Sequence, residues 1–154
     1  MYEYRAKLLK VVDGDTVDID IDLGFGIWMK DERVRIAGID TPESRTSDKV
    51  EKVFGMAAKN RVKELLEKDI VLKTTAAKDG EDMKGKFGRI LGDFYVESEG
   101  KLLTEILLEE GHAVKYHGQA KSDVEIAHMA NRNKLMTEGV IDPAVVQAAE
   151  AEMK

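Results

Sequence analysis

Two periodicities of hydrophobic residues divide the chain. In residues 2–8 and 17–21, hydrophobic side chains alternate with charged ones. A period of two with one polar face predicts strands of a half-buried antiparallel sheet. Asp13-Gly14 predicts a hairpin turn between the two strands. A second turn, at 23–26, should lead into a third strand that ends at about Ile39.

Beyond residue 50 the spacing becomes mostly helical, with one strand between helices and another after a charged loop at 78–85. Gly111 should end one helix. Ser122 and Glu125 form a capping-box pattern that should begin the next, and Asp142 followed by proline should cap a last one. The pattern predicts helices over 53–66, 101–110, 122–137 and 142–153, and strands over 70–74 and 87–96.

The order of these elements indicates a mainly β or α+β fold. Five strands with a helix between the third and fourth predict a five-stranded OB-fold barrel with about three helices packed on it. A generic α+β sandwich would have the same order. We expect residues 1–140 to form the domain and residues 141–154 a helical tail. A short isolated helix is marginal in water, so the tail should pack either on its own domain, which we favour, or on another chain.

Composition narrows the class of protein. The chain has 154 residues, 43% of them hydrophobic, and no cysteine, which excludes disulfides and thiolate zinc sites. Its formal net charge of -6 counts against a nucleic-acid partner, although local basic patches decide such binding. No apolar leader or membrane-spanning stretch is seen. We therefore expect a cytoplasmic monomer without a membrane partner, while secretion by another route stays open.

Three short motifs carry the candidate chemistry: residues 13–16 (Asp-Gly-Asp-Thr), 35–43 (Arg-Ile-Ala-Gly-Ile-Asp-Thr-Pro-Glu) and 86–89 (Lys-Phe-Gly-Arg). Together they supply arginines and carboxylates. Attack on a phosphodiester needs both, because its negative charge must be neutralised and a carboxylate can accept the proton of the attacking water. Strand parity predicts that Asp15 and Arg35 point toward the barrel interior, Arg35 together with Ile39.

Each motif also has a plain structural interpretation. Residues 13–16 and 40–43 could be turns in which aspartate accepts backbone N–H groups. Arg35 could form a structural salt bridge with Asp15 or Asp40. Phe87 could be a core or lid aromatic rather than a platform that stacks on a base.

Taken in order, the three motifs resemble the thermonuclease, or staphylococcal-nuclease-like, family. The resemblance covers about residues 8–137. It implies an OB-fold barrel that hydrolyses DNA and RNA with Ca²⁺, leaving a 5′-hydroxyl and a 3′-phosphate. It also implies residue roles: Asp15, Asp40 and the Thr41 carbonyl as calcium ligands, with Asp13 behind them, Arg35 and Arg89 as catalytic arginines, Glu43 as general base, and Lys84, Lys86, Phe87, Lys115 and Tyr116 along the substrate.

Two positions depart from the family pattern. Phe87 stands where a tyrosine is usual, and His117-Gly118 follows Tyr116 in place of a second tyrosine. Both departures should change the affinity for nucleotides and the base preference, and neither removes a catalytic group. The expected function is a calcium-dependent endonuclease acting on DNA or RNA. The alternative is a nucleic-acid-binding OB-fold module without catalytic activity. A protein–protein adaptor would fit the acidic charge but would leave the inward charges unexplained.

Overall fold

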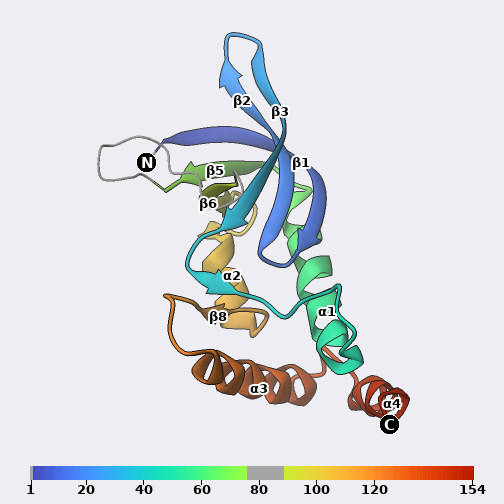
Figure 1. Ribbon diagram of the computed structural model, residues 1–154. Helices are drawn as coiled ribbons and strands as arrows, with labels where there is room; N and C mark the ends of the chain where they lie inside the picture. Colours follow the sequence, from blue (N-terminus) through green and yellow to red (C-terminus); the bar gives the residue numbers. More distant parts are fainter. Residues whose placement is uncertain (1, 76–88) are drawn as a thin grey trace.

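A computed structural model describes residues 2–75 and 89–154 (Figure 1). Within these residues, five long strands close into a barrel that carries four helices. The predicted OB-type barrel is therefore confirmed. The strands are β1 (Glu3–Asp13), β2 (Thr16–Gly24), β3 (Ile27–Ile36), β4 (Ile39–Asp40), β5 (Ile70–Thr74), β6 (Ile90–Val96), β7 (Lys101–Leu102) and β8 (Val114–Lys115); the helices are α1 (Lys49–Leu66), α2 (Leu103–Glu110), α3 (Lys121–Thr137) and α4 (Pro143–Glu152).

Antiparallel hairpins join the first three strands, as the alternating pattern predicts. Val11 pairs with Val17 and Ala6 with Ile21, which places the hydrophobic residues of both strands on the core face. The β1–β2 turn falls at residues 14–15. This register brings Asp15 to the rim of the barrel beside the end of β3.

The barrel closes through a parallel pairing of β3 with β6, in which Val34 faces Ile90 and Arg35 faces Leu91. Strands β5 and β6 form the remaining antiparallel pair, and β5 also pairs with β1. Closure removes the open edges that strands 3 and 6 would otherwise present. It also brings Arg35 next to the chain segment that begins at Arg89, more than fifty residues later in the sequence.

The third strand is shorter than predicted. Strand β3 ends at Ile36, and Gly38 then adopts a positive φ of 80° that reverses the chain before the short strand β4. A positive φ is readily available only to glycine. The parity argument that pointed Arg35 toward the barrel interior together with Ile39 is therefore wrong. A turn separates the two residues, and the β3 residues that join the core are Val34 and Ile36, on either side of Arg35.

Three helix starts also differ from the predictions. Helix α1 begins at Lys49 rather than at Val53, because the Asp48 side chain caps it by accepting from the Val50 and Glu51 N–H groups. Lys101 and Leu102 pair with β6 as strand β7, so α2 begins only at Leu103. Helix α3 begins at Lys121 with Ala120 at its N-cap position and without a side-chain cap, so the predicted Ser122 capping box does not form. The ends of α2 at Gly111 and of α3 at Thr137 agree with the predictions.

Helix α4 packs against its own chain. The Asp142 side chain accepts a hydrogen bond from the Ala144 N–H, as predicted for its N-cap. Val146 joins a hydrophobic cluster with Phe54, Leu135 and Ile141, separate from the barrel core. Only one side of the helix is covered, because Val146 and Ala149 are buried while Val145 and Met153 are exposed.

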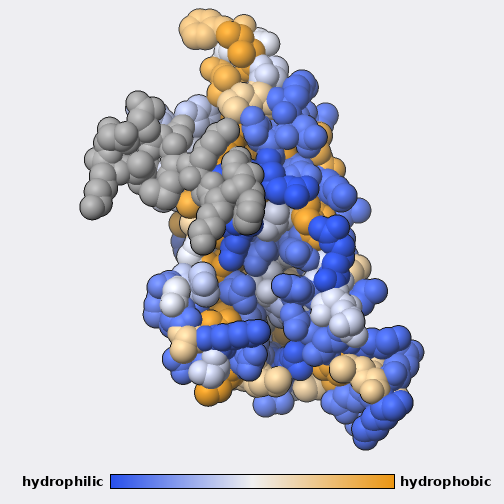
Figure 2. Space-filling model, viewed as in Figure 1, coloured by the Kyte–Doolittle hydropathy of each residue, from blue (hydrophilic) through white to orange (hydrophobic). Residues whose placement is uncertain are grey.

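The other end of the molecule carries an exposed apolar tip. The β2–β3 hairpin extends beyond the barrel (Figure 1), and Figure 2 shows hydrophobic residues at its end. Leu23, Phe25, Ile27 and Trp28 are all exposed there. No helix in the described part of the chain is long and apolar enough to cross a membrane.

Candidate active site

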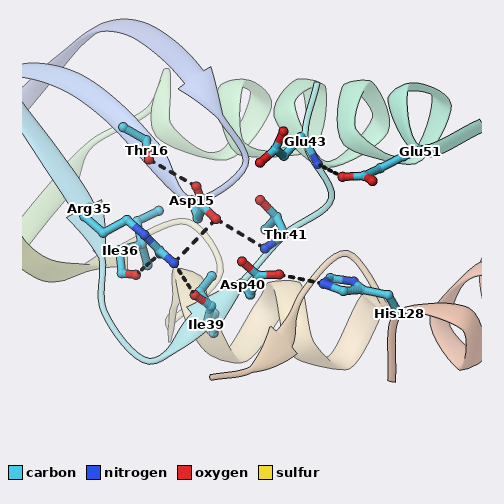
Figure 3. A network of polar contacts seen from close by, with 10 residues as sticks. All are labelled: Asp15, Thr16, Arg35, Ile36, Ile39, Asp40, Thr41, Glu43, Glu51 and His128. Carbon is cyan, nitrogen blue, oxygen red and sulfur yellow. Dashed lines mark hydrogen bonds and ion pairs between the residues drawn. The ribbon is translucent and has the colours of Figure 1, made fainter. Parts of the chain in front are cut away.

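Asp15 lies at the centre of a polar network at the barrel rim (Figure 3). Its Oδ1 accepts the Thr16 hydroxyl at 3.1 Å, and its Oδ2 accepts the Thr41 N–H at 3.3 Å. The guanidinium of Arg35 lies 3.6 Å from the same Oδ2. The Asp15 carboxylate thus accepts a hydrogen bond within its own turn, as the sequence allowed. It also links this turn to β3 through Arg35 and to the end of β4 through Thr41.

Arg35 is held by backbone oxygens as well as by Asp15. Its Nη1 donates to the Ile36 carbonyl at 2.6 Å and its Nη2 to the Ile39 carbonyl at 2.8 Å. These carbonyls lie on either side of the Gly38 turn, so the turn fixes the guanidinium at the rim. The structural salt bridge that was the alternative explanation of Arg35 is present, yet the guanidinium also lines an open cavity.

Strand β4 places Asp40 and Thr41 beside this network. Its pairing with β8 sets Asp40 opposite Val114, and the Tyr116 N–H donates to the Gly38 carbonyl at 2.9 Å. The Asp40 Oδ2 lies 2.7 Å from Nε2 of His128 on α3. Thr41 is buried, and its Oγ1 has no hydrogen-bond partner among the described residues.

Contacts with β1 and α1 position the loop that carries Glu43. The Ser44 N–H donates to Asp13 Oδ1 at 3.1 Å, and the Ser44 hydroxyl also hydrogen-bonds this carboxylate. The Glu43 N–H donates to Glu51 of α1 at 2.9 Å. Gly55 allows the close approach of helix and loop, because a Cβ there would lie 2.1 Å from the Glu43 carbonyl oxygen. Asp13 therefore holds the loop, behind the site.

One cavity of about 830 Å³ collects most of the predicted site residues. Arg35, Asp40, Thr41, Glu43 and Arg89 line it, although they come from segments far apart in the sequence. A volume of this size lies within the usual range for ligand-binding pockets. The second catalytic candidate, Arg89, thus lines the same cavity as Arg35, just before the strand that pairs with β3.

The predicted substrate contacts divide into three groups. Tyr116 lines the cavity. Lys115 is exposed on β8 but is not one of the lining residues. Lys84, Lys86 and Phe87 lie outside the described residues. Their roles stay predictions.

Sequence reasoning missed the second wall of the cavity. Helix α3 contributes Lys121, Glu125, His128 and Arg132 to the lining. Their spacing of three and four residues places them on one face of a helix. That spacing was visible in the sequence, but nothing in it indicated that this face turns toward β4.

The oxygen donors at the rim suit a hard cation. Asp15, Asp40 and the Thr41 carbonyl offer oxygen ligands only, which is the donor chemistry that calcium prefers. No group of three or more histidine or acidic side chains that could hold a metal ion occurs within residues 2–75 and 89–154. A cation at this rim would therefore need water or substrate oxygens to complete its shell.

The protein is thus a closed barrel whose rim carries a cavity lined by arginines and carboxylates. The family described as staphylococcal nuclease homologue matches residues 33–136, and the chain belongs to it. The expected family is thereby confirmed.

Three relatives carry names that describe nucleases. The SPbeta prophage-derived endonuclease YokF of Bacillus subtilis (strain 168) is 32% identical over 131 residues, which cover 79% of this chain and 40% of that protein. Endonuclease YncB of the same strain is 33% identical over 109 residues, 71% of this chain and 46% of that protein. Thermonuclease of Staphylococcus intermedius is 34% identical over 104 residues, 68% of this chain and 55% of that protein. The chain thus spans about half the length of these relatives.

Proposed function

We propose that this protein is a calcium-dependent nuclease that hydrolyses phosphodiester bonds within DNA or RNA strands. The observation that carries the proposal is the convergence of Arg35, Arg89, Asp40 and Glu43 on one cavity. Membership of the staphylococcal nuclease homologue family and the endonuclease names of the relatives support it.

The two arginines would neutralise the phosphate. Arg35 keeps a fixed orientation because two carbonyls and Asp15 hold it, and a guanidinium has further N–H donors that can reach a phosphate oxygen. Arg89 lines the same cavity and would bind the charge that grows on the phosphorus oxygens during attack.

Glu43 would accept the proton of the attacking water. Within the described residues, its backbone N–H is bound by Glu51, whereas no hydrogen bond engages its carboxylate. The carboxylate is exposed and lines the cavity, so it is accessible to water. The products would be a 5′-hydroxyl and a 3′-phosphate.

Asp15, Asp40 and the Thr41 carbonyl would hold the calcium ion. When bound, the cation supplies Lewis-acid stabilisation of the phosphate charge. The Asp15 carboxylate, 14% exposed, is more shielded from solvent than the Asp40 carboxylate, which is 35% exposed.

Nicking of a supercoiled plasmid tests the proposal. The purified protein should convert plasmid to open circles with Ca²⁺ and lose this activity with a chelator. Asp40→Ala should abolish calcium-dependent nicking while leaving the circular dichroism spectrum unchanged. Cleavage that survives both the chelator and Asp40→Ala would refute the calcium assignment. Oligonucleotide binding without any cleavage would indicate the non-catalytic module instead.

A further inference from the structure

Arg132 of α3 lies in the active-site cavity without an acidic partner among the described residues. Its guanidinium carbon lies 5.1 Å from the centre of the Phe54 ring, so the side chain is stacked on α1. Its Nε is buried and has no hydrogen-bond partner within the described part of the chain. A guanidinium held in place without an anion is suited to bind a planar or tetrahedral anion from outside.

The location of Arg132 separates it from the two arginines of the barrel wall. Arg35 is fixed by the Gly38 turn and Arg89 directly precedes β6, whereas Arg132 lies on the helix that forms the opposite wall. The bond from His128 to Asp40 ties this helix to the β4 segment, one helical turn before Arg132. Cations therefore line the cavity from two sides.

The remaining charges on α3 define where an anion can bind. Lys121 lies on the same helix face and lines the cavity. Within the described residues, no ion pair involves it. Glu125 lies between Lys121 and His128 and adds one negative charge to this wall. The carboxylate of Glu51 is turned to the loop by its bond from the Glu43 N–H.

We propose that Arg132 forms a subsite for the phosphate that flanks the scissile phosphate of a bound strand. Lys121 lies three helical turns earlier on α3, about 16 Å along the helix axis, so it would face a more distant part of the strand. This inference rests on the proposed nuclease function, which places the scissile phosphate at Arg35 and Arg89. A strand in the cavity would then be held between the barrel and α3. Substrates with a flanking phosphate would bind more tightly than substrates with a single phosphodiester.

Binding measured in the presence of a chelator tests the subsite without cleavage. The probes are thymidylyl-thymidine, which has one phosphodiester, and the same dinucleotide phosphorylated at its 5′ or its 3′ end. The wild-type protein should bind one of the phosphorylated forms about tenfold more tightly than the plain form, as expected for a charge-assisted hydrogen bond. The end that gives this gain identifies the side of the flanking phosphate.

Arg132→Gln should remove most of that tenfold gain. Arg5→Gln is the matched control, since Arg5 pairs with Glu97 at 3.0 Å and does not line the cavity. The Arg5→Gln variant makes the same change of charge, and it should still bind the phosphorylated probe about tenfold more tightly than the plain one. Glu125→Gln should act in the opposite direction and increase the affinity for the phosphorylated probe.

A longer single strand gives a second readout. The slope of log binding constant against log salt should fall by about 0.7 in Arg132→Gln, which is the loss of one phosphate contact. If loss of the Phe54 contact unfolds that variant, as thermal melting would show, Arg132→Met takes its place, because methionine removes the charge and keeps an apolar contact with the Phe54 ring. An equal gain from the flanking phosphate in the wild type and in the folded Arg132 variant would overturn the subsite. Plasmid nicking is scored separately, so a protein that binds in this way without cutting would refute the nuclease and keep the subsite.

Discussion

The Nε2 atom of His128 lies 2.7 Å from Oδ2 of Asp40, and this hydrogen bond joins α3 to the β4 segment of the barrel rim (Figure 3). It engages one carboxylate oxygen and leaves Oδ1 of Asp40 available for a cation. Both side chains are partly shielded from solvent, with exposed fractions of 15% for His128 and 35% for Asp40. The imidazole therefore fixes the orientation of the proposed metal ligand.

His128→Ala should weaken calcium binding by about tenfold, because partners that orient a metal ligand typically contribute at least this much to affinity. Isothermal titration with Ca²⁺ in the presence of a nucleotide measures the effect directly. His117→Ala serves as the control, since His117 is exposed. An unchanged calcium affinity in His128→Ala would show that Asp40 needs no such partner.

Arg35→Lys and Arg89→Lys should each lower kcat on the order of a hundredfold, as for a lost donor to the transition state. Lysine keeps the charge but lacks the planar fork that donates two parallel N–H bonds to one phosphate. In Arg35→Lys it also cannot bridge the carbonyls of Ile36 and Ile39 while reaching a phosphate. Steady-state cleavage of an oligonucleotide measures kcat. A kcat close to that of the wild type would show that the arginine concerned has a structural role and not a catalytic one.

Gly55→Ala should disturb the Glu43 loop. The new Cβ would lie 2.1 Å from the Glu43 carbonyl oxygen, so the loop or the helix must move. Overpacking of this kind costs about 1–3 kcal/mol, and displacement of Glu43 should lower kcat as well. Denaturant unfolding and cleavage assays measure the two effects. Lys52→Ala, an exposed change on the same helix, should alter neither. Wild-type turnover in Gly55→Ala would mean that the loop position does not matter for catalysis.

His112 should make the stability of the fold depend on pH. It is 5% exposed, and burial lowers the pKa of its imidazole, against the opposing charge of Glu110. The folded protein therefore binds fewer protons at this site than the unfolded chain. The resulting stability is present above pH ~6.5, the ordinary histidine value, and is lost as the pH falls below it.

Denaturant unfolding between pH 7.5 and 5 measures this dependence. One such group contributes at most about 1.4 kcal/mol per pH unit. His112→Gln should flatten the curve in this range, whereas His117→Gln, at an exposed position, should leave it unchanged. A curve for His112→Gln that parallels the wild type would assign the pH dependence to other groups.

Local patterns in the sequence determined most of the elements of this protein. Alternation placed β1, β2 and β5, helical spacing placed α1, and the caps at Gly111 and Asp142 fixed two helix ends. These features depend on neighbours within a few residues, where side-chain periodicity and backbone conformational preferences act directly. The motifs at 13–16 and 35–43 were recognisable as site candidates for the same reason, because they are local turns rich in oxygen atoms that can bind a cation.

Tertiary structure alone decided how those pieces meet. The Gly38 turn, the parallel β3–β6 pairing and the approach of α3 to β4 bring together residues up to 88 positions apart, as in the bond between Asp40 and His128. Such contacts arise from barrel closure and from packing of helices on the barrel, and periodicity contains no information about which helix face meets which strand. For this reason the sequence indicated Asp40 but not His128, and Arg35 but not Arg132.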